Sequence, residues 1–119
     1  MINLGTVNEN KVLDVTVGGK LTRDDYARAT PRLEALLDEH GRLRFLIEIR
    51  DDFEGAEIGA LWDDLRFDVK HGRRFDRTAV VGHGTMEKWA TKISNLFFDA
   101  EMRFFERDEK AEAERWVNA

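Results

Sequence analysis

Two carboxylates and an imidazole occur at helical spacing in the middle of the chain. Asp64, Asp68 and His71 stand at i, i+4 and i+7, which places them on one side of a helix. Such groups could bind a divalent cation or act as general acid and base. His40 and His83 add no recognisable ligand spacing. We expect Asp64 and Asp68 to form solvated ion pairs with nearby Lys or Arg, and His71 to interact favourably with the helix dipole near the helix end. A metal-dependent enzyme that uses the three residues is the alternative.

The segment 66–77, RFDVKHGRRFDR, is strongly basic. Its five Lys/Arg and two Asp give a local charge of +3, which leaves −8 on the rest of a chain whose total is −5. This asymmetry can steer a phosphorylated ligand, an acidic protein or an anionic lipid surface. Helical geometry points Phe67 away from the apolar seam and beside the cations, as a peripheral membrane contact requires. Alternatively, a neighbouring helix or a dimer partner covers Phe67 and Phe75.

Large aromatic side chains concentrate on two predicted helices and on the loop before them. They are Phe53, Trp62, Trp89, Phe97 and Phe98. If the two helices do not pack fully together, these side chains would line an apolar pocket. The plainer alternative is that they fill the core.

Signatures of other chemistry are weak or missing. The chain has no cysteine, which excludes disulfides, thiol catalysis and thiolate metal sites. The GHG run at 82–84 resembles the start of a phosphate loop, but no Gly-rich continuation or Lys-Ser/Thr follows. Ser94 is the only serine and lies in the middle of a predicted helix, without an elbow motif. We expect no cofactor.

The overall composition favours one cytoplasmic domain spanning residues 1–119. That length is enough for a single hydrophobic core. The net charge of −5 argues against non-specific nucleic-acid binding. The first residues lack the pattern of a signal peptide, and no apolar run approaches the roughly 20 residues that a membrane span needs.

Alternating and helical patterns predict the elements that would position these side chains. Residues 12–17 alternate as a half-buried strand, and 2–7 pairs with it through a turn at 8–10. A helix follows, with Thr22 as its cap and Gly41 as its stop. Further strands are predicted at 43–50, 77–82 and 101–106, and further helices at about 55–71, 85–98 and 108–118.

Two positions in the predicted helices carry specific expectations. Pro31 lacks a backbone donor, so we expect either a kink there or a restart with Thr30 as cap. In the last helix we expect Ala111, Trp116 and Val117 to face inward.

The element order is β-β-α-β-α-β-α-β-α. Strands separated by helices pair in parallel through right-handed crossovers. Strands 12–17 and 43–50 are polar at alternate positions, whereas strands buried on both faces are apolar throughout. The sequence therefore predicts an α/β fold with a mostly parallel sheet and helices mainly on one face.

This order, together with several local segments, resembles the SpoIIAA-like family, small bacterial domains of the STAS/Sec14 type. The segments are GKLTRDDY, TPRLEALLDEHG, FLIEI, LWDDLRFDVKH, FDRTAVVG, EMRFF and AEAERWV. The resemblance covers nearly the whole chain and implies the same STAS-like α/β fold. Relatives by fold include anti-anti-sigma factors, domains attached to anion transporters and lipid-carrying Sec14-type domains, and this kinship is an analogy for function.

The resemblance also implies a position for a phosphoswitch, at the start of the helix after the central strand. Here that segment is RDDFEGAEIG, and from Pro31 through Arg77 there is no Ser, Thr or Tyr. A switchable hydroxyl is therefore absent. Asp51, Asp52 and Glu54 can imitate only a fixed negative charge.

We predict a non-catalytic STAS-like binding or regulatory module. Its ligand would be apolar or an anionic amphiphile, and the module would touch the inner membrane face peripherally. The expected ligand-binding residues are Phe53, Trp62, Arg66, Phe67, Lys70, Arg73, Arg74, Trp89 and Phe97. A protein–protein adaptor or a homodimer built on Phe67 and the open sheet face is the main alternative.

Overall fold

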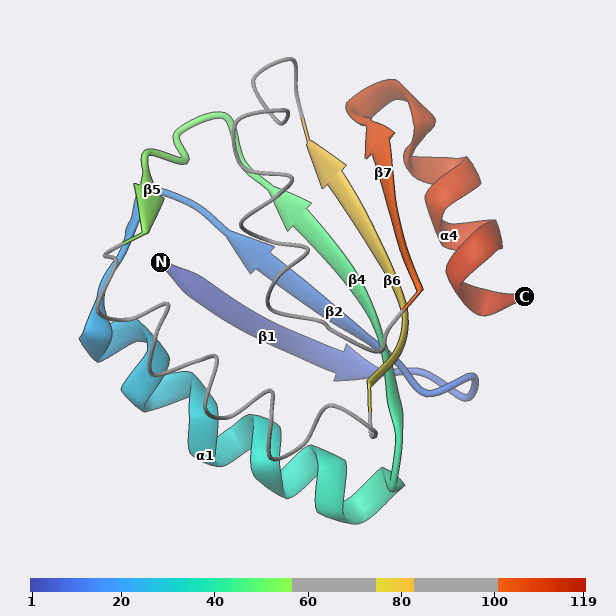
Figure 1. Ribbon diagram of the computed structural model, residues 1–119, viewed down its shortest axis with the longest axis horizontal. Helices are drawn as coiled ribbons and strands as arrows, with labels where there is room; N and C mark the ends of the chain where they lie inside the picture. Colours follow the sequence, from blue (N-terminus) through green and yellow to red (C-terminus); the bar gives the residue numbers. More distant parts are fainter. Residues whose placement is uncertain (57–74, 83–100) are drawn as a thin grey trace.

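The computed structural model describes residues 1–56, 75–82 and 101–119. Their main sheet has the strand order β1-β2-β4-β6-β7 (Figure 1). The strands are β1 (Ile2–Val7), β2 (Val12–Val17), β4 (Leu43–Ile49), β6 (Phe75–Gly82) and β7 (Met102–Glu106). β1 and β2 are antiparallel, and the other three neighbouring pairs are parallel. The predicted α/β class and mostly parallel sheet are confirmed.

The predicted hairpin between β1 and β2 is confirmed. The backbone N–H of Lys11 donates to the carbonyl oxygen of Asn8 at 3.0 Å. The Asn8 side chain also accepts bonds from the N–H groups of Asn10 and Val12, at 2.9 and 3.0 Å. The Asn8 side chain therefore stabilises the turn by accepting hydrogen bonds from its backbone, as Asn commonly does.

The helix after β2, α1, spans Arg23–His40 and begins with a complete capping box. The Thr22 hydroxyl accepts from the Asp25 N–H, and the Asp25 carboxylate accepts from the Thr22 N–H at 2.9 Å. Gly41, at φ +79°, ends the helix and donates its N–H to the Leu37 carbonyl. That positive φ is a conformation that glycine adopts most easily.

Of the two outcomes expected at Pro31, a kink or a restart with Thr30 as cap, the restart is wrong. The helix runs unbroken through Pro31. Thr30 does not cap, because its hydroxyl donates to the Tyr26 carbonyl oxygen at 2.7 Å instead. A side-chain bond of this kind satisfies a carbonyl within the helix close to the site where the proline removes a donor.

The first face of the sheet carries one hydrophobic cluster, packed against α1. In register, Leu13 of β2 lies beside Phe45 of β4, and Val17 lies beside Ile49. All four are buried, as is Leu37 from α1. This is the inward face that the alternation predicts for both strands.

The second face carries a separate cluster against α4 (Lys110–Asn118), which follows a short 3₁₀ helix, η2 (Arg107–Glu109). Its fully buried helix residues are Ala113 and Val117. The inward placement of Val117 is confirmed, whereas Ala111 is exposed and Ala113 takes the buried position. Residues 113 and 117 are spaced i, i+4 and therefore share the side of the helix that packs on the sheet. Residue 111 lies on another side.

The more open part of the second face lies over β1 and β2, where Asn3 and Asp14 are exposed. Across β4 and β6, α4 covers that face. The polar side chains of β4 bind this helix: Arg44 donates to the carbonyl oxygens of Val117 and Ala119 at 2.9 Å, and Glu48 pairs with Lys110.

A second, small sheet joins β3 (Lys20–Leu21) to β5 (Gly55–Ala56) in parallel. The helix predicted to begin at about Gly55 therefore does not begin there. The rest of that helix, and the helix predicted at 85–98, lie outside the described residues. Neither of the two described α-helices is long and apolar enough to cross a membrane.

Candidate functional site

The carboxyl end of β4 leads into a charged loop, residues 50–54, that is fastened to the end of β2. The Arg50 N–H donates to the Val17 carbonyl at 2.9 Å, and the Glu54 N–H donates to the Gly19 carbonyl at 2.8 Å. The Phe53 N–H closes a turn onto the Arg50 carbonyl at 3.1 Å. The backbone therefore presents the side chains between these anchors at the carboxyl-terminal edge of the sheet.

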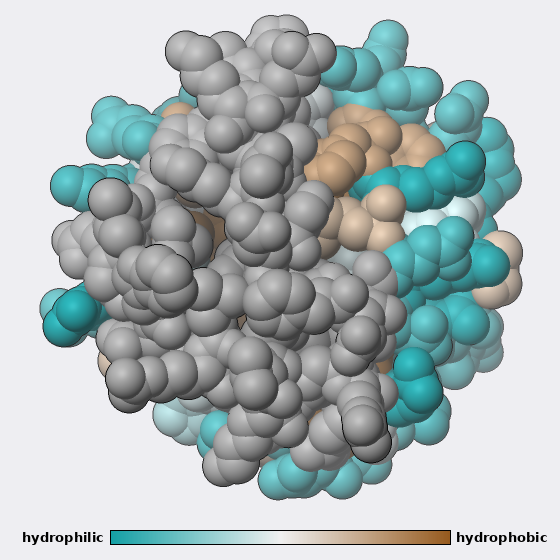
Figure 2. All heavy atoms as spheres, in the orientation of Figure 1, coloured by the Kyte–Doolittle hydropathy of each residue, from teal (hydrophilic) through white to brown (hydrophobic). Residues whose placement is uncertain are grey.

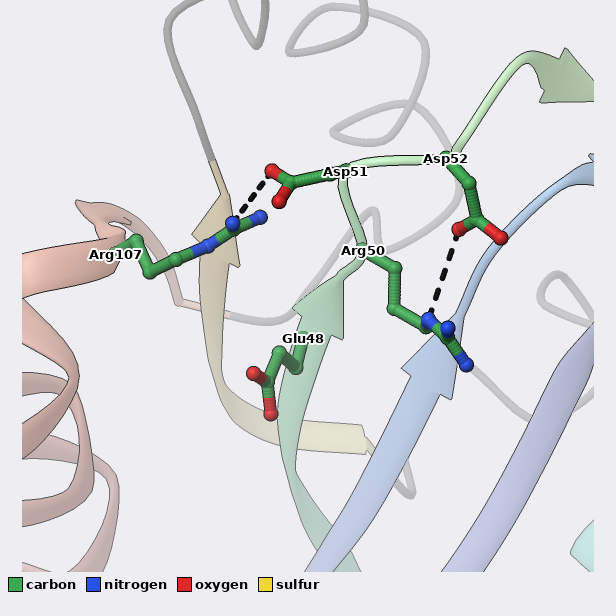
Figure 3. A pocket seen from close by; sticks show the side chains of 5 residues that line it. All are labelled: Glu48, Arg50, Asp51, Asp52 and Arg107. Carbon is green, nitrogen blue, oxygen red and sulfur yellow. Dashed lines mark ion pairs between the residues drawn. The ribbon is translucent and has the colours of Figure 1, made fainter.

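An arginine from the far end of the chain completes this surface. Arg107, the first residue after β7, donates to the Ile49 carbonyl at 3.2 Å and pairs with the Asp51 carboxylate at 2.5 Å. Within the loop, Arg50 Nε lies 3.6 Å from Asp52 Oδ1. Two guanidinium–aspartate pairs thus flank one opening (Figure 3).

Gly18 provides the space in which the second pair lies. A Cβ at this position would come within 2.8 Å of Asp52 Oδ1 and 3.1 Å of Arg50 Cδ. Any larger residue would displace the aspartate or the arginine. The glycine that follows β2 therefore leaves room for the Arg50–Asp52 pair, whose exposed side chains would have to shift to make room for a larger residue.

Between the two pairs lies a hollow of about 300 Å³. The described residues that line it are all charged: Glu48, Arg50, Asp51, Asp52 and Arg107. None of them is a hydroxyl or thiol nucleophile. Exposed pairs of this kind contribute about 1 kcal/mol or less, so a charged group of a ligand can exchange with an aspartate or a guanidinium at little cost.

Glu48 connects the hollow to the second face of the sheet. Its carboxylate binds Lys110 Nζ at 3.1 Å, and it lies close enough to Asp14 to affect that residue's titration. Partial burial raises the pKa of Asp14 above its ordinary 3.8; Glu114 raises it further, Lys110 opposes the rise and Glu48 adds to it. Negative charge therefore accumulates where α4 meets β2 and β4.

Of the predicted ligand-binding residues, only Phe53 lies in the part of the chain that the structure describes. Its side chain is partly buried against the α1-side cluster and does not line the hollow. The other eight lie outside that part: Trp62, Arg66, Phe67, Lys70, Arg73, Arg74, Trp89 and Phe97. Their role as ligand-binding residues stays a prediction.

The proposed acid and base residues Asp64, Asp68 and His71 also lie outside the described residues. Within residues 1–56, 75–82 and 101–119, no group of three or more His, Asp or Glu side chains could hold a metal ion. Of the fixed negative charges expected after the central strand, Asp51 and Asp52 are each neutralised by a guanidinium, which weakens their resemblance to a free phosphate.

Sequence reasoning missed Arg107. A basic residue directly after a strand was the available signal, because carboxyl ends of parallel strands meet at the same edge of a sheet, where ligands bind in open α/β folds. Placing Arg107 near Asp51 also requires knowing that β6 alone separates β4 from β7, and the spacing of elements along the chain does not supply that order.

Comparison with known proteins agrees with this architecture. A sequence profile of the SpoIIAA-like family matches residues 12–118. The chain is similar to the crystal structure of an uncharacterized protein of the DUF3478 family with a SpoIIAA-like fold from Shewanella loihica PV-4. The two share 36% identity over 98% of this chain and 93% of the other, with a TM-score of 0.77. The search of curated proteins found no significant match. This chain therefore belongs to the SpoIIAA-like family.

Proposed function

We propose that this protein is a non-catalytic regulatory module that binds an anionic amphiphile and associates peripherally with a membrane surface. The observation that carries the proposal is the charged hollow at the carboxyl end of β4, formed by segments far apart in the sequence. Membership of the SpoIIAA-like family supports a non-catalytic regulatory module in general, because this fold is generally not enzymatic.

The lining of the hollow favours binding over reaction. Arg50 and Arg107 offer planar donors suited to a carboxylate or phosphate, and their present partners are exposed aspartates. The described lining has three carboxylates and two arginines, so an anionic head must displace an aspartate from its guanidinium. Because both aspartates are exposed, the displaced one does not become a buried unpaired charge. The described lining residues offer no nucleophile to attack such a head.

The rest of the proposed ligand contact comes from residues outside the described part of the chain. Arg66, Lys70, Arg73 and Arg74 supply further cations, and the aromatic residues predicted on the same segments supply apolar surface. Cations beside exposed aromatic side chains are the combination by which peripheral proteins bind anionic lipid surfaces.

Flotation with vesicles tests this proposal. We expect the protein to float with vesicles of phosphatidylglycerol and phosphatidylcholine and to stay behind with phosphatidylcholine alone. Each basic residue near an anionic surface is worth about 1 kcal/mol, so the double charge reversal Arg73→Glu with Arg74→Glu should weaken binding at least about tenfold. Native mass spectrometry of the purified protein should also detect a co-purified lipid.

The matched control reverses two exposed arginines elsewhere, Arg32→Glu with Arg42→Glu, on and just after α1. Both double variants change the net charge equally, so only a local contact separates them. If both double variants lose vesicle binding equally, the loss comes from the change in net charge and not from a local contact. If the protein floats with neither kind of vesicle and carries no bound lipid, the proposal is wrong.

A protein–protein adaptor is the second candidate function. It is favoured by Phe104, an exposed aromatic residue on the strand at the end of the main sheet, β7.

A further inference from the structure

The charges around the hollow balance once Lys110 is counted with its described lining. That lining has three carboxylates and two guanidinium groups, and the carboxylate of Glu48 binds Lys110 Nζ at 3.1 Å. The other carboxylates pair with the guanidinium groups, Asp51 with Arg107 and Asp52 with Arg50. A ligand of one sign would take the partner of one charge and leave a like charge facing it.

We propose that the hollow holds a head group in which a primary ammonium accompanies the anionic group, as in phosphoethanolamine. The anionic group then binds a guanidinium in place of an aspartate, and the ammonium binds the displaced aspartate. Every charge keeps a partner of opposite sign, which an isolated phosphate or carboxylate does not achieve. This inference rests on the proposed function, because it concerns the same hollow and names the chemistry of the head.

The pair that opens to the ligand is Arg50 with Asp52. Arg50 Nε and Asp52 Oδ1 lie 3.6 Å apart, beyond the usual length of an N–H···O hydrogen bond, and both side chains are more than half exposed. Arg107 is held more firmly, because it donates to the Ile49 carbonyl at 3.2 Å as well as contacting Asp51. The looser pair is therefore the easier one to separate.

The two charged groups of the ligand must be close together, because Arg50 and Asp52 extend toward each other from the same short loop (Figure 3). A two-carbon spacer, as in phosphoethanolamine, keeps the ammonium near the phosphate. The phosphate can then bind the planar guanidinium while the ammonium reaches the neighbouring carboxylate.

The described lining also favours a primary ammonium over a trimethylammonium group. A primary ammonium has three N–H donors for a carboxylate. A trimethylammonium group has none, and proteins bind it characteristically with aromatic rings. The described lining contains no aromatic residue, so phosphocholine should bind more weakly than phosphoethanolamine.

The hollow suits the head of an amphiphile rather than its apolar chains. Its volume of about 300 Å³ is small for a ligand pocket, and every described lining residue is charged. Figure 2 shows an apolar area where Figure 1 draws β7, but no residue of β7 lines the hollow. Free phosphoethanolamine and the head of phosphatidylethanolamine present the same groups to this site.

Titration with soluble probes of similar size tests the inference. Phosphoethanolamine carries the ammonium, and ethyl phosphate lacks it. Nuclear magnetic resonance of the nitrogen-15-labelled chain would follow the backbone N–H signals of residues 50–54. We expect phosphoethanolamine to bind at least about fivefold more tightly than ethyl phosphate. Equal or weaker binding of phosphoethanolamine would overturn the inference.

Asp52→Asn should abolish this preference, because it removes the partner of the ammonium and the negative charge beside the phosphate. Phosphoethanolamine should bind about tenfold more weakly, as expected for a lost hydrogen bond between charged groups, whereas ethyl phosphate should bind more tightly. Glu54→Gln changes the net charge equally in the same loop but does not line the hollow, so it should leave the ratio of the two affinities unchanged. An unchanged ratio in Asp52→Asn would contradict the assignment.

Vesicles distinguish a lipid head from a free one. If the ligand is a lipid, replacing part of the phosphatidylcholine by phosphatidylethanolamine should increase flotation, and Asp52→Asn should cancel the increase. Binding of the soluble probe without this increase supports the site with a free ligand. Flotation with phosphatidylglycerol involves no primary ammonium and tests the proposed function separately, so either proposal can fail alone.

Discussion

Asp14 is the residue of β2 at which charges from the central strand and the last helix converge. It is exposed on the face that carries α4, where Glu114, Lys110 and Glu48 act on it. Partial burial is the largest cause of its raised pKa. The folded state therefore holds the Asp14 proton more tightly than the unfolded chain does.

Replacing Asp14 by Asn should stabilise the protein at neutral pH. Since the folded pKa lies above the usual 3.8, the folded state binds more protons in the interval above that value, and the free energy of unfolding falls as pH rises through it. The Asp14→Asn variant lacks this loss of stability. Its urea midpoint should therefore exceed that of the wild type at pH 7, and the two midpoints should converge below about pH 3.8. Glu9→Gln, an exposed change in the hairpin turn, is the control. A variant that is less stable than wild type at pH 7 would contradict this.

At the scale of the element, α1 shows how local signals combine. Its capping box at Thr22 and its glycine stop at Gly41 match the sequence pattern, because both depend on residues within four positions of each other. Pro31 breaks the local rule, and the helix continues through it. Packing of Leu37 and its neighbours against the sheet outweighs the single missing hydrogen bond.

Pro31→Ala should therefore raise the free energy of unfolding. Pro31 is exposed, so no packing is lost, and the new N–H can bond within the helix. A proline inside a helix costs about 3 kcal/mol, while its restriction of the unfolded chain returns up to about 1 kcal/mol; the net gain should be roughly 2 kcal/mol. Ala35→Pro, one turn later and also exposed, should lower stability by a similar or larger amount. Urea unfolding followed by circular dichroism measures both.

At the scale of the whole molecule, one sheet joins two hydrophobic clusters. The α1-side cluster contains Leu37, and the α4-side cluster contains Val117. β6 takes part in both, with Val80 on one side and Ala79 and Val81 on the other, all fully buried. The two layers therefore share a central strand, and we expect them to unfold as a single domain.

Truncation on either side of the sheet tests this cooperativity. Leu37→Ala should cost about 2–5 kcal/mol and Val117→Ala about 2 kcal/mol, from lost burial plus the cavity left behind. In both variants, tryptophan fluorescence and far-ultraviolet circular dichroism should report one coincident urea transition. Arg115→Ala, exposed on α4, serves as the control. A separate early transition in Val117→Ala would mean that α4 detaches independently.

Local patterns were enough to predict the β1–β2 hairpin, both ends of α1 and the buried side of β2 and β4. Each depends on residues a few positions apart, through turn chemistry, capping or the period of a strand. The neighbours of Arg44 and Glu48 could not be predicted this way, because a polar residue at alternate positions looks the same whether it faces water or binds the ends of α4. The meeting of Arg107 with Asp51 depends on the strand order β4-β6-β7. Crossover connections are compatible with several strand orders, so this order cannot be read from the sequence. Only the packed sheet brings the two side chains together.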